Sequence, residues 1–150
     1  MLVQALNLVH SLPITDCPFE ASWESRLKQG EENILAGLVD ESDFDDDNLG
    51  RSPSEILAEL RSLPPLPKLR CFTHGDACLP NFLSQDDELT GIIDLGRAGI
   101  AHPAQDWALA LRSVRSDFGS LGEQLLREHL PAHSADEEVL RRFRLLDELF

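Results

Sequence analysis

A short stretch near the middle of the chain restricts the possible folds more than any other part of the sequence. Residues 74–81 read HGDACLPN, so Asp76 and Asn81 stand in one glycine- and proline-containing segment that cannot continue a helix or a strand. A second polar segment, Asp94-Leu95-Gly96, follows a β-prone run. A fold that satisfies this pattern must hold two polar loops at the ends of short strands.

Three short β-prone segments surround these loops. Residues 69–72, 82–84 and 89–93 are rich in apolar and β-branched side chains, and the polar residues 85–88 separate the last two as a turn. We therefore predict a small β-region in the middle of the chain.

The remaining sequence has helical periodicity. Ser52 and Glu55 form a capping box around Pro53, which predicts a helix that ends before Pro64. We expect further helices at residues 1–10, at 23–38 with a break or softening at Gly30, after Pro103, at 121–130, and from a second capping box at Ser134 and Glu137 to the end. The acids between Asp40 and Asp47 predict a loop.

The predicted fold class is therefore α+β and mainly helical, with a small sheet that displays the polar loops. A chain of 150 residues is long enough for one domain with a core of its own.

Net charge limits the possible partners. The chain carries 27 Asp and Glu against 13 Lys and Arg, a formal charge of -14. Such a chain repels a phosphate backbone, so we expect no nucleic-acid partner. The same field attracts cations and would concentrate a polyamine ligand near a cleft lined with acids, although surplus acid also simply keeps a protein soluble.

Cysteine usage and the first residues bear on the compartment. Cys17, Cys71 and Cys78 are an odd number without a close pair, which favours a reducing, cytoplasmic setting. The first ten residues contain Gln4 and meet Pro13 early, so we expect neither a signal peptide nor a membrane span.

The two polar loops have the spacing of a phosphoryl-transfer site. An Asp and an Asn five positions apart, followed by an Asp-apolar-Gly turn, are typical of kinases. In this interpretation Asp76 accepts the substrate hydroxyl proton, while Asn81 and Asp94 provide the hard oxygen ligands that magnesium prefers.

Two other metal sites fit the sequence less well. Cys71, His74 and Cys78 could bind zinc, but a fourth ligand is missing and the spacing is unusual. The acidic loop fails the calcium-loop pattern, because a frame from Asp43 lacks the required Gly and Glu, and a frame from Asp45 ends on an Ile.

Four segments together resemble the aminoglycoside 3'-phosphotransferases. They are residues 74–81, Asp94 to Arg97, residues 105–113 (QDWALALRS) and the ending LLDELF. The resemblance runs over residues 1–150 and implies the carboxy-terminal lobe of a protein-kinase-like fold. It also implies a kinase that uses ATP and Mg²⁺ to phosphorylate the 3'-hydroxyl of an aminoglycoside, which gives antibiotic resistance.

The resemblance implies a role for each matching residue. Asp76 would be the catalytic base, Asn81 and Asp94 would hold magnesium, and Arg97 would lie near the transferring phosphate. His74 and Asp106 would support the catalytic loop. The residues expected to bind the drug are Asp43, Asp45, Asp46, Arg112, Asp117, Glu148 and Phe150, the last through its terminal carboxylate.

The sequence also departs from the family. His102-Pro103 replaces an Asp and a basic residue, and Ser116 replaces an acid, which affects the expected substrate range. His10, His129 and His133 are expected on the surface. No glycine-rich loop or strand lysine is recognisable, so we expect the amino-terminal nucleotide lobe to be absent and unaided turnover to be negligible.

Alternative functions remain at this stage. The chain could be an inactive remnant that at most binds an aminoglycoside, or a kinase for another small amino alcohol. Choline-kinase-like relatives favour aromatic cages, whereas this chain has no Tyr and only 6% aromatic residues. An acidic mimic of DNA would leave Asp76, Asn81 and Asp94 unexplained. Nothing in the sequence indicates the oligomeric state.

Overall fold

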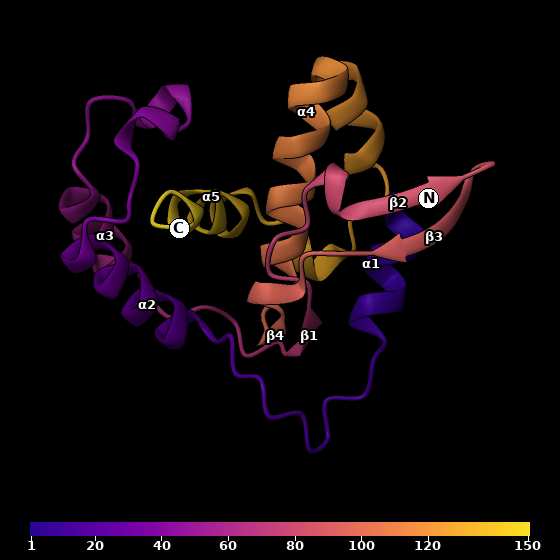
Figure 1. The fold of residues 1–150 in the computed structure, drawn as a ribbon, viewed down its shortest axis with the longest axis horizontal. Helices are drawn as coiled ribbons and strands as arrows, with labels where there is room; N and C mark the ends of the chain where they lie inside the picture. The colour runs from indigo at the N-terminus through magenta and orange to yellow at the C-terminus, as the bar shows by residue number, and fades with distance from the viewer.

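Helices dominate the computed structural model, which describes residues 1–150 (Figure 1). The fold class predicted from the sequence, α+β and mainly helical, is confirmed. The helices are α1 (Leu2–His10), α2 (Trp23–Ala36), α3 (Pro53–Ser62), α4 (Ala104–Arg127) and α5 (Glu137–Asp147), and the strands are β1 (Cys71–Thr73), β2 (Phe82–Gln85), β3 (Glu88–Ile92) and β4 (Gly99–Ala101).

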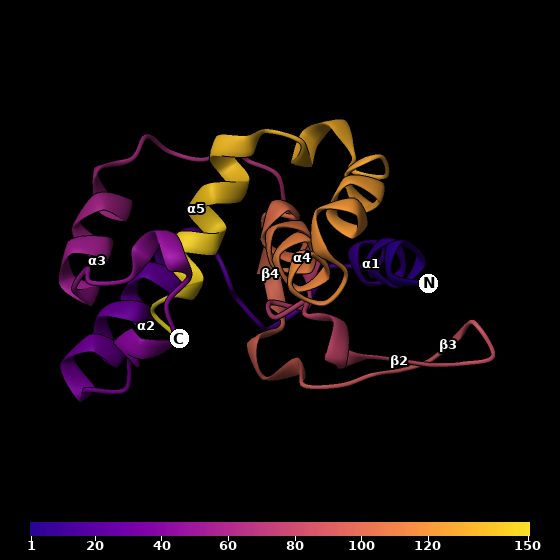
Figure 2. The same cartoon turned by 90° about the horizontal axis from the view of Figure 1, so that it is seen from above.

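Helix α5 lies at the centre of the helical packing. Figure 2 shows it between the α2–α3 pair and α4, with α1 on the far side of α4, and α5 contacts α2, α3 and α4. The apolar faces of these helices meet in one core whose largest fully buried side chains include Trp107, Leu6, Ile56, Leu60 and Leu140. Each such side chain contributes about 1.5–3 kcal/mol through removal from water.

One of the two predicted capping boxes is present. Ser52 accepts a hydrogen bond from the amide of Glu55, whose side chain returns to Ser52, and Pro53 occupies the first turn. The second prediction is wrong, because α5 is capped by Asp136, which accepts from two amides of the first turn. Ser134 is fully buried in the preceding short helix.

Gly30 does not act as predicted. Helix α2 continues through Gly30, where a Cβ atom would lie 2.9 Å from Leu149 Cδ1, so glycine permits close packing instead of a break. The two helices expected after Pro103 are present as the two parts of α4, which a left-handed φ of 67° at Gly119 separates with a kink.

The β-region consists of two separate antiparallel pairs. Strands β2 and β3 form the predicted hairpin, with positive φ at Asp86 and Asp87, as a tight two-residue turn requires. Strand β1 starts at Cys71 instead of residue 69 and pairs with β4, which the sequence did not predict. None of the helices combines the length and the apolar character needed to cross a bilayer.

Candidate active site

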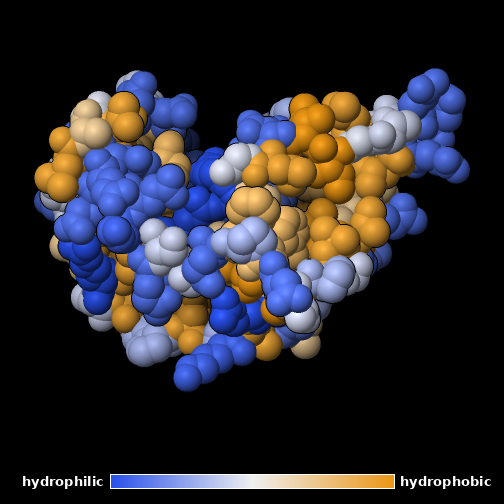
Figure 3. Space-filling model, turned by 60° about the horizontal axis from the view of Figure 1, so that its bottom comes forward, coloured by the Kyte–Doolittle hydropathy of each residue, from blue (hydrophilic) through white to orange (hydrophobic).

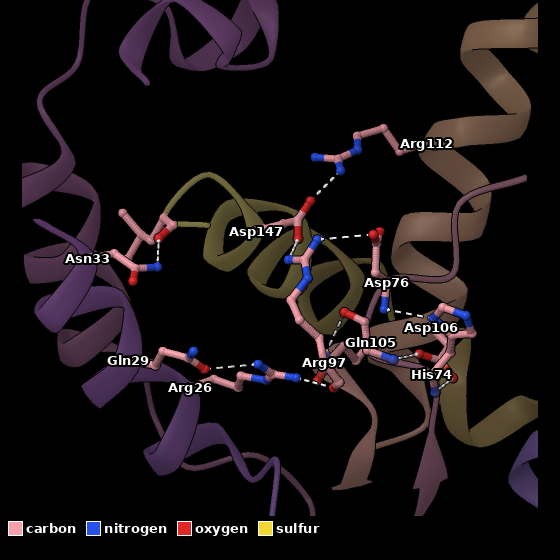
Figure 4. Close-up of polar contacts among 12 residues, drawn as sticks. Arg26, Gln29, Asn33, His74, Asp76, Arg97, Gln105, Asp106, Arg112 and Asp147 are labelled. Atoms are coloured by element: carbon pink, nitrogen blue, oxygen red, sulfur yellow. Dashed lines mark hydrogen bonds and ion pairs between the residues drawn. The ribbon is translucent and has the colours of Figure 1, made fainter. Parts of the chain in front are cut away.

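The first turn of α4 holds the loop after β1 in place through hydrogen bonds. Asp106 is fully buried, and its two carboxylate oxygens accept hydrogen bonds from the amides of His74 (2.8 Å) and Gly75 (2.9 Å). The neighbouring Gln105 donates to the Gly75 carbonyl at 3.2 Å (Figure 4). These bonds fix the backbone just before Asp76 and so help to set the position of its carboxylate.

The buried ring of His74 connects this loop to the end of β3. Its Nε2 lies 2.9 Å from the Ile93 carbonyl, and its Nδ1 accepts from the Asp76 amide at 3.3 Å. A carbonyl only accepts, so Nε2 carries the proton. Both ring nitrogens therefore have protein partners, so His74 has no free nitrogen for the zinc site considered with Cys71 and Cys78. No cluster of three or more His, Cys, Asp or Glu side chains is arranged to hold a metal ion.

Asn81 and Asp94 provide oxygens suited to a small hard cation. The Asn81 amide nitrogen donates to the Asp76 carbonyl (2.9 Å) and carboxylate (3.3 Å), which leaves its Oδ1 for another partner. The Ile93 amide donates to the Asn81 carbonyl at 3.0 Å and so ties Asp94 to the same loop. Asp94 is exposed and has a left-handed φ of 56°, which is uncommon for a non-glycine residue. One carboxylate and one amide oxygen fit magnesium, which completes its shell with water and phosphate oxygens.

An arginine sets the charge state of Asp76. Arg97 Nη2 lies 3.3 Å from Asp76 Oδ2. Burial alone would raise the pKa of Asp76, but the positive charge of Arg97 and hydrogen bonds from Cys78 and Arg97 outweigh it and hold that pKa below its usual range. Asp76 is therefore an ionised acceptor at neutral pH.

Asp147, at the end of α5, joins the two arginines of the site. One carboxylate oxygen accepts from Arg97 Nη1 at 2.7 Å, and the other pairs with Arg112 of α4. Figure 4 shows the Asp147 carboxylate between the two guanidinium groups. Burial would lower the pKa of Arg112, but Asp147 raises it, with a smaller contribution from Asp45 at 3.8 Å.

A cavity of about 520 Å³ lies between the acidic loop, α4 and the chain end. In Figure 3 it corresponds to a hollow with hydrophilic walls between the two halves of the molecule. Acids outnumber arginines in its wall, so the cavity favours a cationic ligand. Its lining consists of Asp40, Asp43, Asp45, Asp76, Asp117, Asp147, Glu148, Arg97, Arg112, Leu38, Phe44, Cys78, Pro80, Ser113, Ser116 and Phe150.

The drug-binding residues implied by the resemblance fall into two groups. All except Asp46 line this cavity, together with Asp76 and Arg97. Asp46 is exposed at the start of a short helix outside the cavity. The sequence-based set also omitted Asp147 and Cys78, which line the cavity and contact the residues around Asp76. The two acids that interrupt the apolar ending LLDELF were the available signal for Asp147.

Glu148 holds the acidic loop in place. Its carboxylate accepts from the Asp45 amide at 3.1 Å and from Asn48 Nδ2 at 2.7 Å, and Phe44 is buried beside it in the same loop. Burial raises the pKa of Glu148, although these hydrogen bonds work in the opposite direction. Glu148 therefore shapes the cavity wall through the loop in addition to contributing charge.

Replacement of Glu148 with Gln should change the pH dependence of stability. The raised pKa means that the native protein binds this proton more tightly than the unfolded chain, so the contribution of Glu148 to stability falls as pH rises through that pKa. The stability of Glu148→Gln relative to wild type should thus improve as pH rises above about 4, the ordinary pKa of a glutamate. Urea unfolding at several pH values measures this difference, and the exposed Glu88→Gln variant is the control. A relative stability that declines over this pH range would contradict the interpretation.

The final residue is fixed beside Arg97. The Phe150 ring lies 5.5 Å from the guanidinium carbons of both Arg26 and Arg97, within cation–π range. Asn33 donates to the Leu149 carbonyl at 2.8 Å. Helix α2 thus holds the chain end against the cavity.

A family profile and several relatives match this chain. The profile of the phosphotransferase enzyme family matches residues 1–145. An aminoglycoside 3'-phosphotransferase of Niallia circulans is 34% identical over 151 residues, covering 100% of this chain and 57% of that protein. The enzyme of the same name from Streptomyces fradiae is 33% identical over 155 residues, covering 99% of this chain and 58% of its own length.

Solved structures give the same result. A type VIII aminoglycoside 3'-phosphotransferase has a TM-score of 0.86 and 30% identity over 99% of this chain and 58% of its own. A Streptomyces rimosus aminoglycoside phosphotransferase in complex with ADP and streptomycin has a TM-score of 0.85 and 28% identity over 99% of this chain and 60% of its own. The resemblance seen in the sequence is confirmed. The chain spans 57–60% of the length of these four proteins.

Proposed function

Because the chain belongs to the phosphotransferase enzyme family, we propose that it takes part in ATP-dependent phosphorylation of an aminoglycoside antibiotic at its 3'-hydroxyl, and that it thereby confers resistance. The observation that supports this most is that Asp76 lines the same cavity as the acidic side chains suited to a polycationic drug. Relatives named aminoglycoside 3'-phosphotransferase match the whole chain, which supports the choice of substrate.

In the proposed reaction, Asp76 orients and deprotonates the substrate hydroxyl. The hydroxyl oxygen forms a bond to the γ-phosphorus of ATP, the bond to the β-phosphate oxygen breaks, and ADP leaves while the proton passes to the Asp76 carboxylate. The lowered pKa of Asp76 keeps this acceptor ionised. Arg97, held between Asp76 and Asp147, would face the transferring phosphate with its charge already oriented.

Asn81 and Asp94 would hold a magnesium ion, which supplies charge neutralisation on the phosphate oxygens. The amide nitrogen of Asn81 is engaged by Asp76, so its oxygen is the atom available to the cation. We propose the cytoplasm as the site of the reaction, because ATP is present there and because the three free cysteines suit a reducing compartment.

The acidic cavity accounts for recognition of the drug. An aminoglycoside is a polycation with few apolar faces, so charge-assisted hydrogen bonds to carboxylates are the main interaction available to hold it. Asp43 and Asp117 lie on opposite sides of the cavity, on the acidic loop and on α4, and both are exposed to a ligand.

A calorimetric titration with kanamycin tests the binding half of this proposal. We expect saturable binding that weakens as salt rises from low to physiological concentration, because screening reduces attraction between exposed charges. Neutralising Asp43 and Asp117 together to Asn should weaken binding at least tenfold, since hydrogen bonds to charged groups contribute about 1.5–3 kcal/mol each.

The matched control removes the same charge from outside the cavity. Asp46→Asn with Asp47→Asn takes two charges from the same acidic loop, but neither residue lines the cavity. This variant should weaken kanamycin binding less than about threefold. Equal losses in the two double variants would mean that only the overall charge matters, and absence of binding by the folded chain would contradict the proposed site.

A further inference from the structure

A side chain from the first helix contacts the support of the catalytic loop. His10 is the last residue of α1, and its Nε2 lies 2.9 Å from Asp106 Oδ2, although 96 positions separate the two residues. The sequence-based expectation that His10 lies on the surface is wrong, since its side chain is only 13% exposed. The reaction described above assigns this contact no role.

The donors around Asp106 show why this contact matters. A fully buried carboxylate is costly unless donors surround it. Asp106 receives the amides of His74 and Gly75, and the only side chain that donates to it is His10, because no Lys or Arg pairs with it. A carboxylate only accepts, so the proton lies on Nε2 of the imidazole.

The two residues of the His10–Asp106 contact are held in place by the packing of the helices that carry them. Helix α1 contacts β1, which leads into the catalytic loop. It also lies beside α4, which carries Asp106 (Figure 2). His10 and His74 approach the same oxygen, Oδ2, while Gly75 uses Oδ1. A carboxylate held by three donors has less freedom to rotate about its terminal torsion than one held by two.

We propose that His10 is a positioning residue for the catalytic loop. It orients the Asp106 carboxylate, which aligns the amides of His74 and Gly75 and so holds Asp76 at a fixed distance from the substrate hydroxyl. The inference rests on the proposed phosphotransferase function for its kinetic consequence, but not for its structural one. A displacement of about 1 Å at a reacting group can reduce a rate 100-fold even when the altered residue is remote from the chemistry.

Three substitutions of His10 separate this role from simple packing. His10→Leu fills the space without a donor, His10→Gln carries an amide N–H with about the reach of Nε2, and His10→Asn carries one that is too short. Amide hydrogen exchange of the full chain, followed by NMR, reports the His74 and Gly75 bonds directly.

We expect exchange at His74 and Gly75 to accelerate about tenfold in the Leu and Asn variants and to return towards wild type in the Gln variant. The exposed His129→Leu variant is the control and should leave both amides unchanged. Unchanged exchange in folded Asn and Leu variants would overturn the proposal, as would equal acceleration in all three His10 variants. The Gln and Asn variants keep the test decisive if His10→Leu does not fold.

Kinetics then connects the contact to the reaction. In protein that phosphorylates kanamycin, His10→Asn should lower kcat about 10–100-fold while KM for the drug stays unchanged, and His10→Gln should recover most of the rate. A rise in KM with unchanged kcat would overturn the positioning role. If the His10 variants show altered amide exchange but the wild-type chain transfers no phosphate, the structural role of His10 would be retained and only the proposed function would be contradicted.

Discussion

Asp76→Asn is expected to lower phosphoryl transfer to kanamycin by about 10²–10⁴-fold, the usual contribution of a positioned general base. Asn has the same shape and can still meet Asn81 and Arg97, but it cannot take the hydroxyl proton. Drug affinity should change by less than about twofold, because the Asp76 charge is largely used by Arg97 at 3.3 Å and by hydrogen bonds within the loop.

Single-turnover transfer from labelled ATP, in protein that phosphorylates kanamycin, measures the rate, and calorimetric titration with kanamycin measures the affinity. The control is Asp86→Asn, the same change in the exposed turn of the β2–β3 hairpin, where Asn tolerates the positive φ. Turnover comparable to wild type in Asp76→Asn would contradict the catalytic role. A parallel loss of rate and affinity would indicate that Asp76 acts mainly in binding.

The second large effect concerns the backbone of the same loop. Gly75 has a φ of +83°, and a Cβ atom there would lie 1.9 Å from the carbonyl oxygen of Arg97. That oxygen accepts a hydrogen bond from Arg26, which restricts its movement away from Gly75. Gly75→Ala should lower the free energy of unfolding by about 2–5 kcal/mol, from left-handed strain plus overpacking.

Gly50 provides a matched control for this prediction. It has the same φ of +83°, but no atom lies within 4 Å of the position that a Cβ atom would take there. Gly50→Ala should therefore cost only the conformational part, about 1–2 kcal/mol. Urea unfolding of the two variants isolates the clash with Arg97 as their difference, and equal losses would show that the two loops do not meet as closely as described.

The local parts of this fold were predictable from the sequence. Two examples are the capping box at Ser52 and Glu55 and the turn at Asp86 and Asp87. Each depends on residues only a few positions apart, so a local sequence pattern is enough to predict it. The errors arose where packing decided the outcome. Gly30 remains helical because α2 approaches Leu149 closely, and β4 exists because Gly99 to Ala101 finds a partner in β1.

The candidate site divides in the same way. Asp76, Asn81 and Asp94 could be proposed from the sequence because their spacing along one strand-loop-strand segment is typical of a phosphoryl-transfer site. Asp147 was missed because its role depends on two arginines that lie 50 and 35 positions away. Asp46 was included because the acidic loop looks uniform in sequence. In the structure Glu148 holds this loop through the Asp45 amide, and only some of the acids of the loop line the cavity.

By itself the sequence determined the fold class, the order of most elements and the position of the candidate catalytic loop, because hydrophobic periodicity, caps and motif spacing are properties of neighbouring residues. Tertiary structure alone decided which polar groups meet. The contacts of His10 with Asp106, of Arg97 with Asp147 and of the Asp45 backbone amide with Glu148 join segments that are distant in the chain. Their contacts follow from how α1, α4 and α5 pack, which no local pattern encodes.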